Sequence, residues 1–392
     1  MDGYGLMKGA GMTVENRFAG ASRAPDYVED DSPAKGESSA LVSSEDADVE
    51  RTSIALAHGD SAPGLEPFSK GVVIGGVEIP PEVERVLDRA PASEGWRGGV
   101  NSLSGGTAKL APSPAEWRTR IAAARVARAE KVIRRTTWTR AAGILVANRK
   151  GNAGKTPTSI ALGGVISSIR GGSVAIMEVS DDRGQLFYRA EGSPLLGMGE
   201  LVENIAAITN QGQLKGYTAP QESFASVIGT SGFRPAMTEQ NVIDVSKVID
   251  VYFDIRLMDS GNQYTSSAFA GAVRTADMLI IPTMNSADSI FDALDLIDFL
   301  RNSQDPHQRM LAETALVVRL SDGRPELKAQ RVLSYFHDKG IPDDRIFEVP
   351  FDRHIADRDE INVKFLDAKT RDAFALIGAA AVDQISLNIT ER

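Results

Sequence analysis

Downstream of residue 140 the chain alternates between short apolar runs and longer segments with apolar positions every three to four residues. Short runs of this kind are typical of buried strands, and the longer ones of amphipathic helices. Buried strands separated by helices predict an α/β fold, with a mostly parallel sheet flanked by helices on both faces. The expected strands are 144–147, 174–179, 225–228, 253–258, 278–282 and 315–318, and the expected helices lie near 155–170, 195–208, 238–250, 263–275, 286–303, 325–339 and 369–386.

Residues 1–92 have a different texture. They are rich in Gly, Ser, Ala, Pro, Asp and Glu, acids outnumber bases by about two to one, and helical or strand periodicity is almost absent. Such a composition predicts a disordered acidic N-terminal region. Its one apolar exception, 72–79, suits a short strand or a docking segment. The region is either a solvated tail or an arm that binds a partner or covers the basic segment behind it.

The charge inverts over residues 93–140, which we expect to form a basic linker and an amphipathic helix. Ser113 and Glu116 have the spacing of a capping box, and Pro114 suits the first helical position. A helix is therefore predicted over about 114–135. Its arginines are either solvated or contact nucleic acid, an anionic membrane surface or an acidic partner. A globular domain is then expected over 141–392.

Composition narrows the function classes. The chain has 392 residues, a formal net charge of −10 and a pI of about 5.1, which argues against binding of polyanions over its whole surface. It has no cysteine, which excludes disulfides and thiolate metal sites and suits a cytoplasmic location. Its four histidines have no metal-ligand spacing. No signal peptide and no integral membrane segment is expected, because no apolar run approaches the roughly 20 residues of a span.

One stretch carries recognisable chemistry, and it follows the first strand of the domain. After the apolar run 143–147, a Gly-containing turn leads through Gly154, Lys155 and Thr156 into a helix. This order is that of a P-loop, in which backbone N–H groups and a helix N-terminus cradle phosphate, the lysine reaches the terminal phosphates and the threonine holds Mg²⁺. The spacing fits a lysine-led variant, Lys150-Gly-x-x-Gly-Lys-Thr.

The lysine-led loop resembles the deviant Walker A motif of the ParA/MinD family of P-loop ATPases. Further stretches resemble that family in the same order: its second strand and switch I, its Walker B strand ending in Asp259, the strand after it, and two late strands near the base. These stretches are 175–184, 254–261, 275–282, 315–319 and 349–356, so that the resemblance covers about 141–385.

The resemblance implies ATP and Mg²⁺ as ligands and a nucleotide-dependent homodimer. Lys150 matches the family's signature lysine, which reaches across the dimer to the partner's phosphates. Thr156 and Asp259 match the residues that hold Mg²⁺. The positions that would contact the nucleotide are Lys150, Gly151, Asn152, Ala153, Gly154, Lys155, Thr156 and Pro157 in the loop, with Arg319, Pro350 and Asp352 near the base.

Three departures from the family pattern concern turnover. Asn152 replaces a glycine, although Asn tolerates positive φ better than most residues. Pro157 replaces Thr or Ser and removes an N–H that would donate to the α-phosphate, a loss that predicts about tenfold to a hundredfold weaker nucleotide binding. Ser180 stands where the family has the acid that positions the attacking water, and Asp182 is a poorly placed substitute. We therefore predict weak or absent ATP hydrolysis.

The segments 95–97 and 112–118 also resemble the pre-ATPase region of actinobacterial MinD-like proteins, some of them associated with type VII secretion, as in the EspI group. The resemblance implies a switch that positions a cargo, either a plasmid or chromosome locus or a secretion or cell-envelope machine, through a protein partner or cargo adaptor. Two alternatives stay open. One is a non-catalytic pseudo-ATPase scaffold, and the other is an adaptor that binds DNA non-specifically, or a partner, through the basic 114–140 helix.

Overall fold

The protein is seen in a computed structural model, which describes residues 79–323 and 329–390. The expected disorder of residues 1–78, and nearly all of the apolar segment 72–79, lie outside the described residues. The prediction of disorder is wrong at its C-terminal end, because Pro81–Arg89 form helix α1. Pro81 suits the first helical position. The acids in the first turn and Arg89 in the last turn complement the helix dipole.

Eight strands form one sheet in the order β3-β4-β2-β5-β1-β6-β7-β8. Every neighbouring pair is parallel except β3 and β4. The six predicted strands are confirmed, with β3 and β8 in addition. Their bounds are β1 Ala142–Val146, β2 Val174–Val179, β3 Ala219–Pro220, β4 Ser226–Ile228, β5 Ile255–Ser260, β6 Met278–Met284, β7 Leu316–Leu320 and β8 Ile346–Val349.

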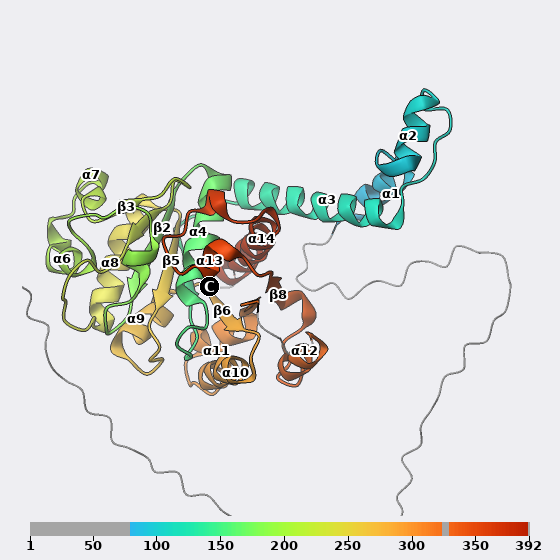
Figure 1. Cartoon of the computed structure of the whole chain (residues 1–392). Coiled ribbons are helices and arrows are strands. Elements are labelled where there is room, and N and C mark those ends of the chain that lie inside the picture. The colour runs from blue at the N-terminus through green and yellow to red at the C-terminus, as the bar shows by residue number, and fades with distance from the viewer. Residues whose placement is uncertain (1–78, 324–328, 391–392) are drawn as a thin grey trace, which may run out of the picture. The chain divides into compact units, whose positions relative to one another are not determined.

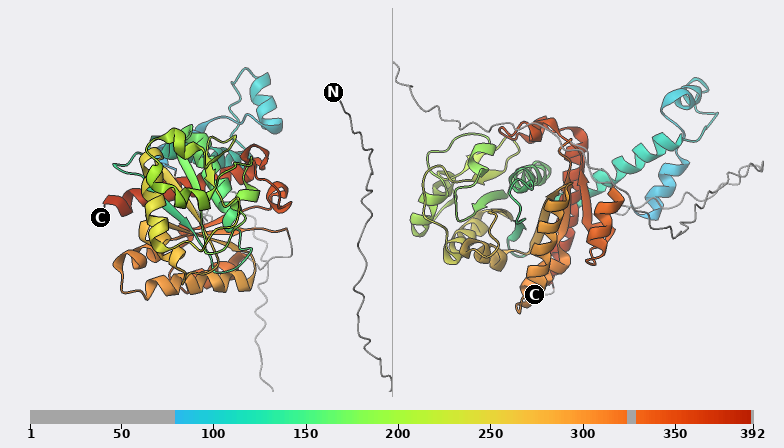
Figure 2. Two further views of the ribbon diagram at one scale, coloured as in Figure 1. Left: turned by 90° about the vertical axis from the view of Figure 1, so that its left-hand side faces the viewer. Right: turned by 60° about the horizontal axis from the view of Figure 1, so that its bottom comes forward.

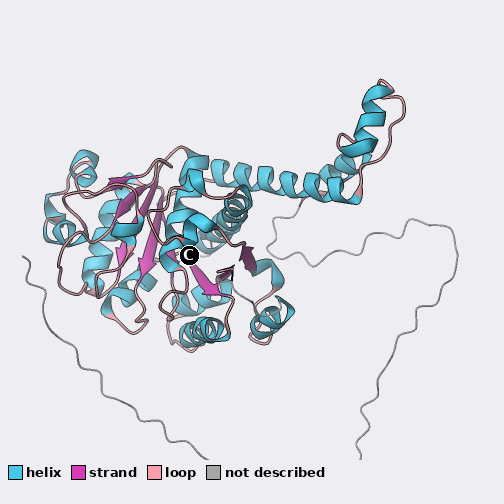
Figure 3. Ribbon diagram, in the orientation of Figure 1, coloured by secondary structure: helices cyan, strands magenta, loops and turns pink. Residues whose placement is uncertain are grey.

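Helices lie on both sides of the sheet (Figures 2 and 3). Successive side chains of a strand point to opposite faces, and the core divides accordingly: Ile144 and Val146 belong to one apolar cluster, and Leu145 to the other. The first cluster includes α4 (Lys155–Arg170), α14 (Ala368–Thr390) and the end of α3 (Pro114–Arg135). The second includes α6 (Met198–Glu203), α8 (Glu239–Tyr252), α9 (Ser267–Thr275), α10 (Ala287–Arg301), α11 (Pro306–Thr314) and α12 (Ala329–His337).

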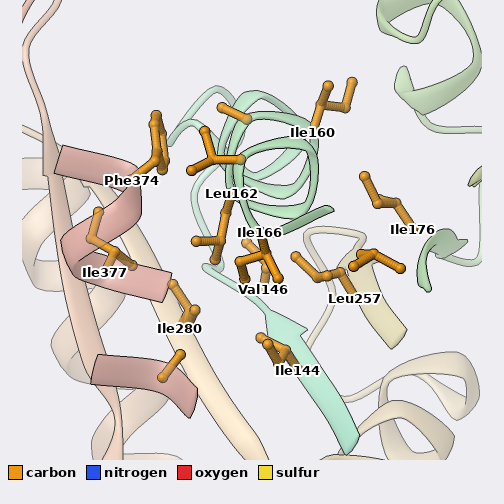
Figure 4. Close-up of a cluster of buried hydrophobic side chains, with 14 of the residues drawn as sticks. Ile144, Val146, Ile160, Leu162, Ile166, Ile176, Leu257, Ile280, Phe374 and Ile377 are labelled. Carbon is orange, nitrogen blue, oxygen red and sulfur yellow. The ribbon is translucent and has the colours of Figure 1, made fainter. Parts of the chain in front are cut away.

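The helix that follows the phosphate-loop motif, α4, is packed in the centre of the molecule. Its apolar side chains meet those of α14 and of the strands beneath (Figure 4). Dense packing of this kind fixes the position of the helix N-terminus relative to the strand ends. The labelled members of the cluster are Ile144, Val146, Ile160, Leu162, Ile166, Ile176, Leu257, Ile280, Phe374 and Ile377.

Most helices were predicted within a few residues, but not all. The helix expected at 195–208 is broken into α6 and a short 3-10 turn at Ile205–Ala207. The described chain also contains α2 (Gly95–Leu103), α5 (Leu186–Arg189), α7 (Gln211–Lys215), α11 and α13 (Arg353–Ala356), none of which was expected, and 3-10 turns at Asp343–Arg345 and Val363–Phe365.

The basic helix α3 has the predicted bounds, and the Ser113 side chain caps it by accepting a hydrogen bond from the Glu116 N–H. The other half of the predicted capping box is replaced, because the Glu116 carboxylate accepts from the Ser93 N–H. Its C-terminal half packs on the domain, with Ala129 and Ile133 fully buried in the core near α4 and α14. Its N-terminal half carries α1 and α2 (Figure 1).

Candidate functional site

The loop after β1 is anchored at its first residues. Asn148 is buried, and its Nδ2 donates to the Pro282 carbonyl oxygen at 2.8 Å. Its Oδ1 accepts from the Lys150 N–H at 2.8 Å. One side chain thus ties the start of the loop to β6, which fixes where Lys150 leaves the sheet.

Two loop residues have the left-handed backbone conformation. Gly154 has φ 93°, and a Cβ there would lie 2.6 Å from Leu320 Cδ1, so that only glycine fits. Asn152 has φ 62°, as expected for an asparagine in place of a loop glycine. Pro157 is the third residue of α4, where its ring is accommodated and its missing N–H breaks no helical hydrogen bond.

Lys155 is held beneath the loop with 8% of its surface exposed. Its ammonium donates to the Lys150 carbonyl oxygen at 3.0 Å and to Asn262 Oδ1 at 2.6 Å. Burial lowers the Lys155 pKa to about 8, with Asp259 acting in the opposite sense. The charge is therefore desolvated and only partly compensated, which favours an anionic ligand at this position.

Asp259, near the end of β5, faces the start of α4. Its Oδ2 accepts from Thr156 Oγ1 at 2.7 Å and its Oδ1 from Ser159 Oγ at 3.3 Å. Burial raises its pKa to about 7, against the effect of these hydrogen bonds and of Lys155. A hydroxyl and a buried carboxylate in contact are hard oxygen donors, and they fit Mg²⁺, which takes one or two protein ligands and completes its shell with water and phosphate.

Lys150 is partly exposed and pairs with Asp288, at the start of α10, with 2.9 Å between Nζ and Oδ2. The hydrogen bond that Lys150 donates to Asp288 is the largest cause that raises the Lys150 pKa. A hydrogen bond from Ser286, followed by the one from Lys150, lowers the Asp288 pKa to about 2. Arg149 pairs similarly with Asp295 of the same helix. Both basic side chains at the start of the loop are therefore paired with acidic side chains of α10.

The segment after β2 is held by a buried arginine. Arg234 donates to the carboxylate of Glu178 at 3.1 Å and to the carbonyl oxygen of Ser180 at 2.8 Å. It also donates to the carbonyl oxygens of Asp181 and Asp182. Ser180 Oγ donates to the Asp182 carbonyl oxygen. The Ser180 hydroxyl is thus engaged within its own loop, and the Asp182 side chain is exposed.

The residues expected near the base lie on the far strands of the sheet. Arg319, near the end of β7, is buried and forms an ion pair with Glu348 on β8. Pro350 and Asp352 follow β8. Asp352 is also buried, and its two oxygens accept from the N–H groups of His354, Ile355 and Asp367, so that it caps α13.

The parallel strands therefore bring Lys150, Lys155, Thr156 and Asp259 together. Ser180 directly follows β2, the strand that pairs with β5. Asp259 is in register with Val146 of β1 and Glu178 of β2. Arg319, Pro350 and Asp352 lie at or after the ends of β7 and β8, farther along the same edge of the sheet.

Four further side chains contact the site: Ser159, Arg234, Asn262 and Asp288. Asn262 follows the strand-end aspartate by three residues, and Ser159 lies one helical turn after Lys155, so spacing alone could have pointed to both. Arg234 comes from a loop distant in sequence and Asp288 from the first turn of α10, and neither has a local signal.

Metal clusters and membrane spans are two other kinds of site. Within residues 79–323 and 329–390, no group of three or more His, Cys, Asp or Glu side chains is placed to hold a metal ion. In the same part of the chain one helix, α14, has the length and hydropathy of a membrane span. Half of that stretch is buried, and it packs on α3 and α4 as a core helix does.

No family model matches the sequence. Two curated relatives do, the ESX-1 secretion-associated protein EspI from the CDC 1551 and H37Rv strains of Mycobacterium tuberculosis. Each is 22% identical over 310 residues, which cover 77% of this chain and 44% of the relative. The chain thus spans less than half the length of the curated relatives it matches.

Solved structures with a similar fold include a ParA family ATPase from Chlorobium tepidum, at 14% identity and a TM-score of 0.46, which covers 64% of this chain and 97% of that one. MinD from Pyrococcus horikoshii, complexed with Mg-ADP, has 14% identity and a TM-score of 0.45, with 61% and 94% covered. The mostly parallel sheet flanked by helices, the lysine-led loop between β1 and α4 and the aspartate near the end of β5 give this chain the P-loop type of α/β fold that its motifs predicted.

Proposed function

We propose that the chain binds ATP with Mg²⁺ and acts as a nucleotide-dependent dimer switch that positions a cargo. The observation that carries this proposal is the contact of Thr156 with Asp259 beside the buried ammonium of Lys155. A desolvated cation at a helix N-terminus, next to two hard oxygen donors, suits a magnesium-bound polyphosphate.

The residues around the expected phosphate position have distinct parts in this proposal. Lys155 neutralises the terminal phosphates, and the backbone around Gly154 admits them because it has no side chain. Thr156 and Asp259 hold Mg²⁺, which when bound shields the phosphate charge. Asn262 accepts a hydrogen bond from the Lys155 ammonium and so fixes the position of that ammonium.

Lys150 supports the dimer part of the proposal. Its side chain is 40% exposed and reaches away from the loop to Asp288, so that it is available to an approaching partner. In a dimer around two nucleotides the Lys150 ammonium would leave Asp288 for the phosphates of the second protomer. ATP binding and dimerisation would then depend on each other.

Hydrolysis is proposed to be slow. The Ser180 hydroxyl donates within its own loop, and Arg234 clamps the carbonyl oxygens around it. Neither offers the carboxylate that orients an attacking water. This observation also favours the second candidate function, a non-catalytic scaffold that keeps the fold and the dimer surface without turnover.

The kind of cargo is proposed from the similarity to the curated relatives. The name of the curated relatives places them with a secretion system, and this chain would accordingly act in the cytoplasm on secretion or cell-envelope machinery through a protein partner. Partition of a plasmid or chromosome locus is the other form of the same positioning activity.

Calorimetric titration with ATP and Mg²⁺, combined with light scattering, tests the proposal. We expect binding in the wild type, its loss in Lys155→Ala, and retained binding without dimerisation in Lys150→Ala. Lys247→Ala, which alters a surface lysine paired only locally with Asp244, is the matched control. Absence of ATP binding in the wild type would overturn the proposal. ATP binding without dimerisation would support the nucleotide site but overturn the proposed dimer switch. Rapid release of phosphate would overturn the proposal of slow hydrolysis.

A further inference from the structure

Helices α1 and α2 are held on the N-terminal half of α3 mainly by polar contacts. Glu116 Oε1 accepts from the Ser93 N–H and from Arg120, both at 2.7 Å. Arg120 also donates to the carbonyl oxygens that end α1. The buried Asn101 side chain accepts from the Leu110 N–H and donates to the Ala92 carbonyl oxygen. The fold of this tip therefore does not depend on its larger apolar side chains.

Those apolar side chains are exposed instead. Trp96, Val100 and Leu103 of α2 have 71%, 39% and 92% of their surface exposed. Their spacing of four and three residues places them on one face of the helix, which we call the α2 stripe. Three exposed apolar residues in a row on a nine-residue helix indicate a surface that another phase or molecule covers.

The segment that contains the stripe is positive on a chain that is otherwise acidic, and most of its excess charge lies on α3. Residues 79–140 carry twelve Lys or Arg and six Asp or Glu side chains, whereas the whole chain has a net charge of −10. Arg118, Arg128, Lys131 and Arg135 are exposed along α3. An anionic surface would therefore attract this part of the chain and repel the rest, which sets the orientation of an encounter.

We propose that the α2 stripe attaches the chain peripherally to an anionic lipid bilayer. Trp96 and Leu103 would enter the boundary between headgroups and acyl chains, where tryptophan is favoured, and the α3 bases would lie against the headgroups. A bilayer takes up an apolar stripe without a matching groove. This role is independent of nucleotide binding.

The other occupants fit less well. DNA would engage the bases of α3 but offers no apolar surface for Val100 and Leu103. A second copy would bring two positively charged segments together, and three side chains bury far less than the roughly 800 Å² per partner of a stable interface. An acidic protein groove is the remaining alternative, and the experiment below separates it from lipid.

The test is sedimentation of the full chain with vesicles of phosphatidylcholine containing phosphatidylglycerol, and with vesicles of phosphatidylcholine alone. We expect binding to the anionic vesicles that weakens with added salt and falls about tenfold or more in the double variant Trp96→Ser, Leu103→Ser. Leu195→Ser, which changes a leucine 95% exposed elsewhere on the surface, is the matched control and should bind as the wild type does. Thermal unfolding shows whether the double variant is folded.

Each other outcome overturns the proposal. Failure of the wild type to bind anionic vesicles leaves a protein groove as the occupant of the stripe. Binding that survives in the folded double variant assigns the membrane contact to another surface, such as α14. Equal binding to neutral and anionic vesicles would show that the basic side chains of α3 do not contribute to the attachment. A wild-type dimer that the double variant loses assigns the stripe to a second copy, and DNA retention lost in the double variant assigns it to nucleic acid.

Discussion

The guanidinium of Arg234 donates hydrogen bonds to both the carbonyl oxygen and the side-chain oxygen of Ser180, at 2.8 and 3.2 Å. The same group forms an ion pair with Glu178, and both side chains are almost fully buried. One arginine thus holds the strand-end carboxylate and the loop that follows it. The loop is thus held by hydrogen bonds within the protein.

Replacement of Arg234 by Met should therefore destabilise the fold and loosen residues 180–184. Glu178 would be left as a buried carboxylate without its cation, which costs about 3–5 kcal/mol. Denaturant unfolding measures the loss, and hydrogen exchange locates it. Arg183→Met, which removes a more exposed arginine bonded to Thr230 and Ser231, is the control and should cost much less. Unchanged exchange at 180–184 in Arg234→Met would contradict the clamp.

Lys155→Met should stabilise the ligand-free protein while it abolishes ATP binding. Burial lowers the Lys155 pKa to about 8, so the charged ammonium costs the fold stability at neutral pH, by about 1–3 kcal/mol. Methionine fills the same space without a charge. Thermal unfolding with and without ATP checks both halves. A lower unfolding temperature for Lys155→Met would show that the bonds to Lys150 and Asn262 outweigh the burial cost.

Stabilisation by magnesium nucleotide should have an optimum between about pH 7 and pH 8. The pKa of Asp259 is raised to about 7, so the carboxylate is charged, and able to bind Mg²⁺, only as the pH rises through that value. The pKa of Lys155 is lowered to about 8, so its charge is lost above that pH.

The ligand-free protein should behave in the opposite sense on the acid side. A raised carboxyl pKa contributes stability below the unfolded value of 3.8, and this contribution is lost as the pH rises through 7. Unfolding temperatures measured across this range with and without Mg-ATP give both curves. In Asp259→Asn the acid limb of the nucleotide effect should vanish; its persistence would assign it to another group.

Local patterns in the sequence were enough for the parts of the site that are contiguous. The loop from Lys150 to Pro157 follows from spacing, and the cap of α3 follows from Ser113 and Glu116. Asp259 required only the apolar strand before it. Strand β8 was missed because its four residues include the charged Glu348, which breaks an apolar run.

The remaining features depend on tertiary structure. Arg234 meets Ser180 across 54 positions, and Asp288 meets Lys150 across 138 positions. No periodicity relates such pairs, because the sheet order that joins them is set by the packing of both faces. Helix α1 was missed for another reason: the acidic composition around it resembles that of unfolded chains, although its initial proline and the charges at its two ends favour a helix.

The Gly154→Ala variant should lose nucleotide binding although the fold persists. A Cβ at residue 154 would lie 2.6 Å from Leu320 Cδ1, and φ of 93° is unfavourable for alanine. The loop would have to move away from β7 and from the Lys155 ammonium. Calorimetric ATP titration and thermal unfolding separate the two effects, and Leu320→Ala in the same chain should restore part of the binding if the clash dominates over the backbone strain.

Asp288→Asn should strengthen ATP-dependent dimerisation. In the free chain the Lys150 ammonium is paired with Asp288, and in the proposed dimer it must leave that carboxylate for the partner's phosphates. An uncharged amide lowers the cost of leaving, so the dimer should form at several-fold lower protein concentration with the unfolding temperature unchanged. Asp295→Asn, which removes one of the two carboxylates of the same helix that pair with Arg149, is the matched control and should dimerise as the wild type does. Light scattering against protein concentration measures the shift. If Lys150→Ala abolishes the dimer while Asp288→Asn leaves it unchanged, the pair does not restrain the lysine.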